Sequence, residues 1–323
     1  TGGTRTGTRE LWTYAGPSHY HFVEERKYDT AWGFAQSGGI GGILAARDSI
    51  RQMMPEDKLW PIADNETWSF HTVLQGLEYF DAIFKMMEQQ YGAPADFEDF
   101  CDKLYAMNYN SARGMYEAYA RYKYEALGIT TWKYNAAWPA ALTWQYVDWY
   151  KRASAAYYGA KKACTPVHAL YGYDDGSIHV TNSYYRPYSD LTLRYAAYNL
   201  DGAKVMENSV AVSVDADGSV QAATVEAPQG VSDPWFLKLE LRDSADALLS
   251  NNAYWLSHTP VVNAVAVKFF SIRNVISSTV TRAASSSRLP MSLFVASCSD
   301  TSTATEYTSA KYDSFDISNV RTA

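Results

Sequence analysis

The feature that most constrains the fold of this chain is a change in hydrophobic period near residue 165. Upstream, apolar residues recur at helical spacing, most clearly through residues 67–91 and 96–126. Downstream of Pro166, apolar and polar residues alternate. A period near 3.6 predicts amphipathic helices, whereas a period of two predicts half-buried strands. The chain must therefore contain a helical part followed by a part built from strands.

The helical part contains two short stretches rich in β-forming residues. We expect strands over residues 30–35 and 129–134, and helices over residues 45–54, 67–91, 96–126 and 142–163. Strands that alternate with helices are typical of a β/α fold. Two strands cannot close a barrel by themselves, so this part of the chain requires further strands from outside it.

The second part is predicted to be a β-sandwich. Clusters of turn-forming residues, such as Asp201-Gly202 and Asn251-Asn252, separate its short strands. The strands are expected over residues 177–183, 191–200, 209–214, 219–225, 235–242 and 253–257. Short strands at regular spacing indicate an immunoglobulin-like sandwich. The Ser/Thr-rich tail after Pro260 is either the start of a further β domain or a partly ordered tail.

Charge and motif content exclude several classes of function. The net charge is −7 and there is no basic run, so nucleic acid is not an expected partner. No stretch approaches the roughly 18 apolar residues of a membrane span. The three cysteines are far apart and lack metal-ligand spacing, and the glycines of residues 38–42 lack the spacing and lysine of a P-loop. We therefore expect neither a cofactor nor a metal ion.

The aromatic content, with 26 tyrosines and 10 tryptophans, is compatible with a carbohydrate ligand. Aromatic faces pack on the C–H faces of sugars while polar groups bind the hydroxyls. The alternative is a tyrosine-rich core and surface with no ligand. Asn65-Glu66-Thr67 is an N-glycosylation sequon, which supports secretion, although Asn65 can equally cap the following helix. The opening Gly/Thr tract, residues 1–8, is typical of an internal loop, so we expect the protein to contain residues upstream.

Several segments in order resemble the exo-β-D-glucosaminidase branch of glycoside hydrolase family 2, which also contains β-mannosidases. The resemblance covers about residues 10–260. In the helical part it rests on YGA at residues 91–93, on Asn108-Tyr109 to Arg113, and on WKYNAAW at residues 132–138. Beyond these it rests on YYGAKKA at 157–163, PVH at 166–168, YGYDD at 171–175, YNLDG at 198–202 and NAYWLS at 252–257.

The resemblance implies the C-terminal part of a (β/α)8 barrel over residues 1–163 and an immunoglobulin-like β-sandwich over residues 164–260, with residues 261–323 beyond them. It also implies a retaining mechanism, in which two carboxylates about 5 Å apart act as general acid and nucleophile. Such sites lie at the carboxyl ends of barrel strands. The residues expected around the sugar are Tyr20, His71, Tyr109, Trp132, Asn135 and Trp138.

The nucleophile position departs from the family pattern. The family has Gly-Phe-Asn-x-Glu-x-x-x-Gly, whereas this chain has GFAQSGGIG at residues 33–41. Ser37 therefore occupies the position of the nucleophilic glutamate. A serine without a base is a poor nucleophile toward an anomeric carbon. The general acid belongs to an earlier strand that would lie before residue 1.

Two functions follow from these observations. The first is a catalytically degenerate relative that binds a glycan or has a structural role in an extracellular assembly. The alternative is a working retaining exo-β-glucosaminidase or β-mannosidase whose upstream half carries the general acid. Both predict a β-linked amino sugar or mannoside as the ligand, and the upstream half of the same protein as an intramolecular partner. Both also predict secretion, or residence in a lysosome-like or vacuole-like lumen.

Overall fold

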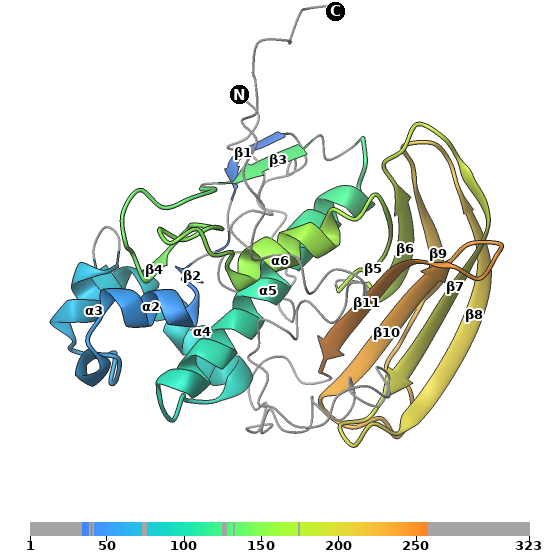
Figure 1. Ribbon diagram of the computed structural model, residues 1–323. Coiled ribbons are helices and arrows are strands. Elements are labelled where there is room, and N and C mark those ends of the chain that lie inside the picture. Colours follow the sequence, from blue (N-terminus) through green and yellow to red (C-terminus); the bar gives the residue numbers. More distant parts are fainter. Residues whose placement is uncertain are drawn as a thin grey trace, which may run out of the picture. The chain divides into compact units, whose positions relative to one another are not determined.

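A computed structural model describes residues 34–257 except 39, 41, 73–75, 125–127, 132 and 174 (Figure 1). Its helical part contains β1 (Phe34–Gly38), β2 (Ile43–Leu44), α2 (Arg47–Met53), η2 (Glu56–Lys58), α3 (Glu66–Phe70), η3 (Gly76–Phe80), α4 (Asp81–Tyr91), α5 (Phe97–Arg121), β3 (Gly128–Thr131), β4 (Leu142–Thr143) and α6 (Ala155–Ala163). Its sandwich contains β5 (Val167–Tyr171), β6 (Ser177–Asn182), β7 (Tyr188–Tyr198), β8 (Lys204–Val214), β9 (Ser219–Thr224), β10 (Trp235–Arg242) and β11 (Leu248–Leu256).

The single helix expected over residues 67–91 is interrupted. Asn65 begins α3 by accepting hydrogen bonds from the amides of Thr67 and Trp68. The chain then leaves the helical path at His71, and helical structure resumes only at Gly76, whose φ of 71° is readily adopted by glycine. The hydrophobic spacing was read correctly after the interruption, where Phe80 and Met87 are buried, but Phe70 before it is exposed. The interruption itself was missed because apolar residues continue through it.

The helix expected over residues 142–163 is wrong in its first half. Residues 142 and 143 form β4, and the helix α6 begins only at Ala155, after the Ser154 side chain accepts a hydrogen bond from the amide of Tyr157. Between them, Gln145, Tyr146 and Asp148 are buried in irregular backbone. Burial of these residues in a connecting segment gives the same apolar spacing as a helix, and periodicity alone cannot distinguish the two.

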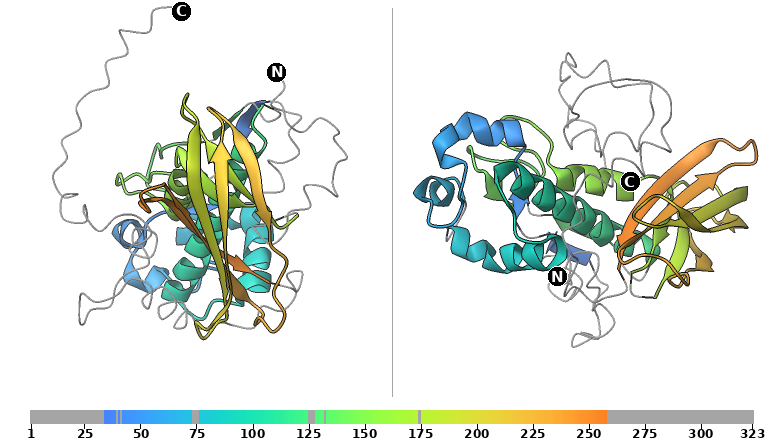
Figure 2. Two further views of the ribbon diagram at one scale, coloured as in Figure 1. Left: turned by 90° about the vertical axis from the view of Figure 1, so that its right-hand side faces the viewer. Right: turned by 90° about the horizontal axis from the view of Figure 1, so that it is seen from below.

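The helix α5 is the central element of the helical part. Its N-cap is Asp96, whose carboxylate accepts from the amide of Asp99. One face of α5 packs with α2, α3 and α4 around the buried rings of Trp68 and Phe100. Another face packs against α6, and the two helices run side by side (Figure 2, right). This contact is close because α6 presents Gly159 to the α5 backbone at Tyr109 and Arg113.

The strands of the helical part form two small pairs. The strands β1 and β3 run parallel, with Phe34 opposite Gly128 and Gly38 opposite Thr131. The segments that follow these strands meet again, because β2 pairs with β4 in antiparallel fashion. Thr72 forms a further parallel bridge with Leu142. Three chain segments that are distant in sequence are thus joined beyond the carboxyl ends of β1 and β3.

The immunoglobulin-like sandwich predicted after residue 164 is confirmed. One sheet has the strand order β11-β10-β7-β8 and the other β5-β6-β9, and all pairs are antiparallel. The two sheets enclose an apolar core that includes Leu193, Leu237 and the ring of Tyr254. The strand β5 was not predicted, because four of its five residues are buried and its sequence, VHALY, does not alternate between apolar and polar residues. Residues 261–323 lie outside the described part of the chain.

Candidate functional site

The candidate active-site edge is formed by the carboxyl ends of β1 and β3. Ser37 is the last residue but one of β1, and Gly38 lies opposite Thr131 across the parallel pair. Trp132, which follows Thr131 directly, lies outside the described residues. Carboxyl ends of neighbouring parallel strands present their following loops at one edge, which is where ligands of β/α folds bind. The backbone therefore brings the Ser37 position and the β3 exit to the same edge.

A buried asparagine of α5 holds the segment that leaves this edge. The Asn108 amide donates to the carbonyl of Gly42 at 2.9 Å and accepts from the amide of Leu44 at 3.0 Å. Tyr105, one turn earlier, donates its hydroxyl to the carbonyl of Ala45. Glycine is required at position 42, since a Cβ there would lie 2.8 Å from the Phe80 ring. The exit from β1 is therefore fixed by α5 and by close packing.

Two of the predicted sugar-binding residues are brought together. The rings of His71 and Trp138 stack at 5.9 Å with an interplanar angle of 12°, and Phe70 meets both edge-on. The His71 Nδ1 lies 2.7 Å from the carbonyl oxygen of Pro139, which orients the imidazole. Phe70 is 67% exposed, so the cluster has an open aromatic face. An aromatic face beside polar groups is suited to packing against a pyranose ring.

The other predicted site residues are distributed differently. Asn135 is exposed, and its side chain donates to the carbonyl of Ala136. Tyr109 lies on α5, where the guanidinium carbon of Arg113 is 5.3 Å from its ring, so its ring contacts a different cluster from the His71–Trp138 pair. Tyr20 lies outside the described residues. Asn65 caps α3, and its Nδ2 donates to the carbonyls of Lys58 and Pro61, so a glycan on that nitrogen would displace one of these bonds.

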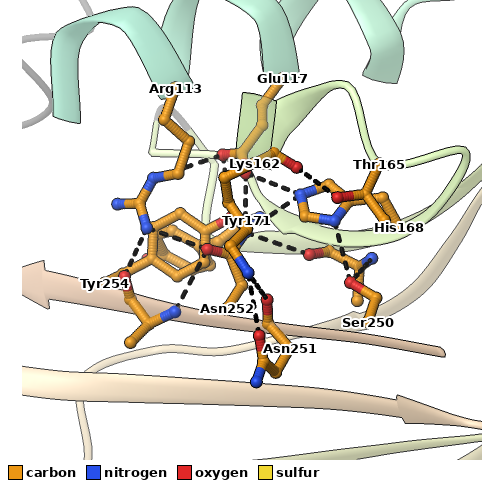
Figure 3. Close-up of polar contacts among 12 residues, drawn as sticks. Arg113, Glu117, Lys162, Thr165, His168, Tyr171, Ser250, Asn251, Asn252 and Tyr254 are labelled. Carbon is orange, nitrogen blue, oxygen red and sulfur yellow. Dashed lines mark hydrogen bonds and ion pairs between the residues drawn. The ribbon is translucent and has the colours of Figure 1, made fainter. Parts of the chain in front are cut away.

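A cluster of polar residues, here called the buried joint, lies between α5 and the sandwich (Figure 3). The Arg113 guanidinium donates to the Oδ1 of Asn252 at 2.9 Å and to the carbonyl of Ala253. The carboxylate of Glu117 accepts from Asn252 and from the hydroxyl of Tyr254, and one of its oxygens lies 2.9 Å from the Nε2 of His168. The side chains at positions 113, 117 and 168 are at most 2% exposed.

The charges of the buried joint are compensated within it. Burial acts to lower the pKa of Arg113, but Tyr173, Glu117 and Tyr254 raise it well above its ordinary value. Burial, reinforced by the charge of Glu117, raises the pKa of Tyr254 well above its ordinary value, so the phenol stays protonated and can donate. Hydrogen bonds to the other polar atoms offset the cost of burying such an ion pair. The Nε of Arg113 is the exception in this cluster, because it has no hydrogen-bond partner and lies 4.0 Å from the Glu117 carboxylate.

The buried joint was missed by the sequence interpretation, although the sequence contained a signal. Arg113, Glu117 and Arg121 are spaced four residues apart and therefore lie on one face of α5. Arg121 continues the contact by pairing with Asp175 at 2.6 Å. A charged stripe on a helix usually faces solvent, and here nothing in the sequence showed that the stripe meets a second domain.

The chemistry available in the described residues is limited. No group of three or more His, Cys, Asp or Glu side chains there could hold a metal ion. No helix in that part combines the length and apolar character needed to cross a membrane. Cys101 is buried, which raises its pKa to about 12, and Cys164 is exposed; neither forms a disulfide. The chemistry of the candidate active-site edge and of the buried joint is therefore that of hydrogen-bonding, ionic and aromatic groups.

Comparison with known proteins places these features in a family. Residues 175–259 match the Mannosidase Ig/CBM-like domain. The chain is 33% identical over 256 residues to an exo-β-D-glucosaminidase of Streptomyces avermitilis, covering 76% of this chain and 28% of that protein. A mannosylglycoprotein endo-β-mannosidase of Lilium longiflorum is 27% identical over 245 residues, covering 70% of this chain and 25% of that protein. The chain thus spans less than a third of the length of these relatives.

Solved structures show the same relationship. The exo-chitosanase CsxA of Amycolatopsis orientalis matches with a TM-score of 0.68 and 29% identity, over 76% of this chain and 30% of that one. A β-D-mannosidase from Dictyoglomus thermophilum, at 17% identity and a TM-score of 0.62 over 79% of this chain and 30% of that one, shares the fold. The resemblance drawn from the sequence is confirmed, and the chain belongs, as a partial chain, to the exo-β-D-glucosaminidase and β-mannosidase branch of glycoside hydrolase family 2.

Proposed function

We propose that this chain is part of a secreted glycan-binding protein that has lost the hydrolytic chemistry of its family at Ser37. In this proposal β1 and β3 are two strands of a (β/α)8 barrel whose other strands belong to the upstream half of the protein. The ligand is a β-linked amino sugar or mannoside, bound at the edge where β1 and β3 end. The Ig-like sandwich supports the barrel through the buried joint.

The observation that carries the proposal is the residue type at the end of β1. A retaining glycosidase needs a carboxylate there to attack the anomeric carbon and form the glycosyl-enzyme. A serine hydroxyl has no charge to stabilise an oxocarbenium-like transition state and needs a general base to become nucleophilic. The rings of His71 and Trp138 stack on each other and offer an aromatic surface for a sugar ring. Binding can therefore persist where hydrolysis is lost.

The second candidate function is a working exo-β-glucosaminidase. It is supported by the names of the relatives, several of which are exo-β-D-glucosaminidases. It requires a carboxylate from another segment to take over the role of nucleophile, at about 5 Å from the general acid. The two candidates differ in one measurable property, which is turnover of a β-glucosaminide by the unaltered protein.

The test is to restore the carboxylate. We expect the full-length protein to leave p-nitrophenyl-β-D-glucosaminide and the corresponding β-mannoside intact, and Ser37→Glu to hydrolyse one of them. Ser37→Gln is the matched control, because it has the same length without a nucleophilic carboxylate, and it should stay inactive. Hydrolysis by the unaltered protein would overturn the proposed loss of chemistry. Absence of sugar binding by every variant, measured by calorimetry, would favour a purely structural role.

A further inference from the structure

We propose that Asn108 of α5 is a positioning residue for the candidate active-site edge. Its one side chain holds the backbone segment that leaves β1, and through that segment it also holds the stacked rings of His71 and Trp138. It acts through the backbone and not by touching a ligand. The effect on sugar binding rests on the proposed function, whereas the effect on the position of the rings does not.

The side chain of Asn108 pairs with β2 as a neighbouring strand would. It is buried, and its amide donates to the carbonyl of Gly42 and accepts from the backbone amide of Leu44. Backbone N–H groups of successive residues in an extended strand point to opposite edges. The amide of the next residue, Ala45, donates to the carbonyl of Ala141, directly before β4. Asn108 therefore occupies the edge of β2 that faces away from β4.

This pairing fixes the exit from β1. Gly42 follows Gly38, the last residue of β1, by four positions. Ile40, between them, is buried in a cluster with apolar residues of α5 and α6. Tyr105, one turn before Asn108, donates its hydroxyl to the carbonyl of the residue after β2. The connection is short and is held at its far end, so the direction in which β1 presents its end depends on α5.

The same pairing reaches the aromatic pair through β4. β2 pairs with β4, which begins at Leu142. The amides of Ala141 and Leu142 donate to the carbonyl of His71. The carbonyl of Pro139 lies 2.7 Å from the Nδ1 of His71, and a carbonyl oxygen can only accept, so Nδ1 carries the hydrogen. The backbone that β2 holds therefore orients the imidazole, and with it the ring of Trp138 that stacks on it.

Water cannot easily replace the two hydrogen bonds of Asn108. Gly42 is buried and Leu44 is fully buried. Asn108→Ala would leave a buried carbonyl and a buried amide without partners, and the segment must move to satisfy them. A binding site works only while its groups are held within about 0.5 Å of the productive geometry. Loss of Asn108 should therefore weaken binding at the edge, although Asn108 itself is part of the supporting helix.

The experiment compares two variants of α5 in the full-length protein by two readouts. Asn108→Ala should bind p-nitrophenyl-β-D-glucosaminide about tenfold more weakly in calorimetry. It should also shift the fluorine NMR resonance of Trp138 in protein labelled with 5-fluorotryptophan, assigned by its absence in Trp138→Phe. Arg121→Met is the control, because it breaks the ion pair with Asp175 at the other end of α5. It should lower the urea midpoint and leave both the affinity and the Trp138 resonance unchanged.

A third variant, Asn108→Asp, tests the hydrogen bonds themselves. The introduced carboxyl has nearly the shape of the amide. When it is ionised it still accepts from the amide of Leu44, but it faces the carbonyl of Gly42 without a hydrogen to donate. When it is protonated its hydroxyl can donate to that carbonyl. Compared with the unaltered protein at the same pH, the affinity and the Trp138 resonance should be altered at about pH 8 and recover toward about pH 5, whereas Asn108→Ala should not recover.

The outcomes separate positioning from general stability and from the proposed function. The positioning role is overturned if Asn108→Ala and Asn108→Asp leave the Trp138 resonance and the affinity unchanged. It is also overturned if Arg121→Met changes both as much as Asn108→Ala does, because loss of stability then explains the result. If the unaltered protein binds no sugar, the proposed function fails, and the Trp138 resonance alone decides the role of Asn108. If Asn108→Ala does not fold, the pH series of Asn108→Asp decides it.

Discussion

At the residue scale, Glu117 is an acidic side chain that is almost completely buried, at 2% exposure, among polar partners. Its carboxylate accepts hydrogen bonds from Asn252 and Tyr254 and pairs with His168, and Arg113 lies one helical turn away. Replacing it with alanine leaves the buried guanidinium of Arg113 without its counter-charge, and leaves the Asn252 amide and the Tyr254 hydroxyl without this acceptor. We expect Glu117→Ala to lower the free energy of unfolding by about 3–5 kcal/mol. Urea denaturation followed by circular dichroism measures this change.

Two further variants test the reason for that loss. Glu117→Gln keeps the shape and one acceptor, and should cost less than the alanine variant. Glu88→Ala removes an exposed glutamate of α4 and should change stability by no more than about 0.5 kcal/mol. A loss of under about 1 kcal/mol in Glu117→Ala would contradict the description of the buried joint as a compensated ionic network, because breaking a buried pair costs more than that.

His71 and Trp138 were both predicted to line the sugar site, and the structure stacks their rings. The stretch from residue 132 to 138 resembles the last barrel strand of the family, and a strand was predicted over residues 129–134, whereas β3 ends at Thr131. The buried joint was not predicted, because His168 and Asn252 become partners of Glu117 only when the sandwich folds back onto α5. His168 is 51 residues and Asn252 is 135 residues away from Glu117 in the sequence. Contacts over such separations do not produce a periodic pattern in the sequence. Sequence patterns report local structure, and this site is non-local.

At the element scale, the contact between α5 and α6 depends on one missing side chain. A Cβ on Gly159 would clash with the carbonyl oxygen of Tyr109 and approach the amide nitrogen of Arg113 to 3.1 Å. Alanine in a helix is ordinarily favoured over glycine by about 1 kcal/mol. Here we expect Gly159→Ala to destabilise the protein instead, by roughly 1–3 kcal/mol, because the two helices must separate. The melting temperature from thermal unfolding shows directly whether Gly159→Ala is less or more stable than the unaltered protein.

The control for this prediction lies on the same helix. Lys161 is exposed on α6, so Lys161→Ala should leave stability nearly unchanged. An increase in melting temperature in Gly159→Ala would mean that helix propensity outweighs packing and that the α5–α6 contact is looser than described.

The elements themselves were largely predictable: β10 lies over the expected residues 235–242. Errors occurred where burial mimics a helical period, as between β4 and α6.

At the scale of the whole molecule, ion pairs at the end of α5 link the helical part to the sandwich. Arg121 pairs with Asp175, and Lys123 pairs with Asp217. Partial burial acts to raise the pKa of Asp175, but hydrogen bonds from Ser177 and the charge of Arg121 outweigh it and lower the pKa. The hydrogen bond from Lys123 lowers the pKa of Asp217. Both carboxylates therefore have a lower pKa in the folded chain than in the unfolded one.

The pH dependence of stability follows from the direction of these shifts. A carboxylate with a lowered folded-state pKa contributes stability above its unfolded pKa of about 3.9, and this contribution is lost as the pH falls through the folded-state pKa. We expect Asp175→Asn/Asp217→Asn to be less stable than the unaltered protein at pH 7, with the difference shrinking below about pH 4. Urea midpoints measured between pH 7 and pH 2.5 test this convergence, and Asp57→Asn, an exposed carboxylate of η2, is the control. A constant difference across that range would show that the two aspartates act through packing and not through charge, and would remove the electrostatic part of the link between α5 and the sandwich.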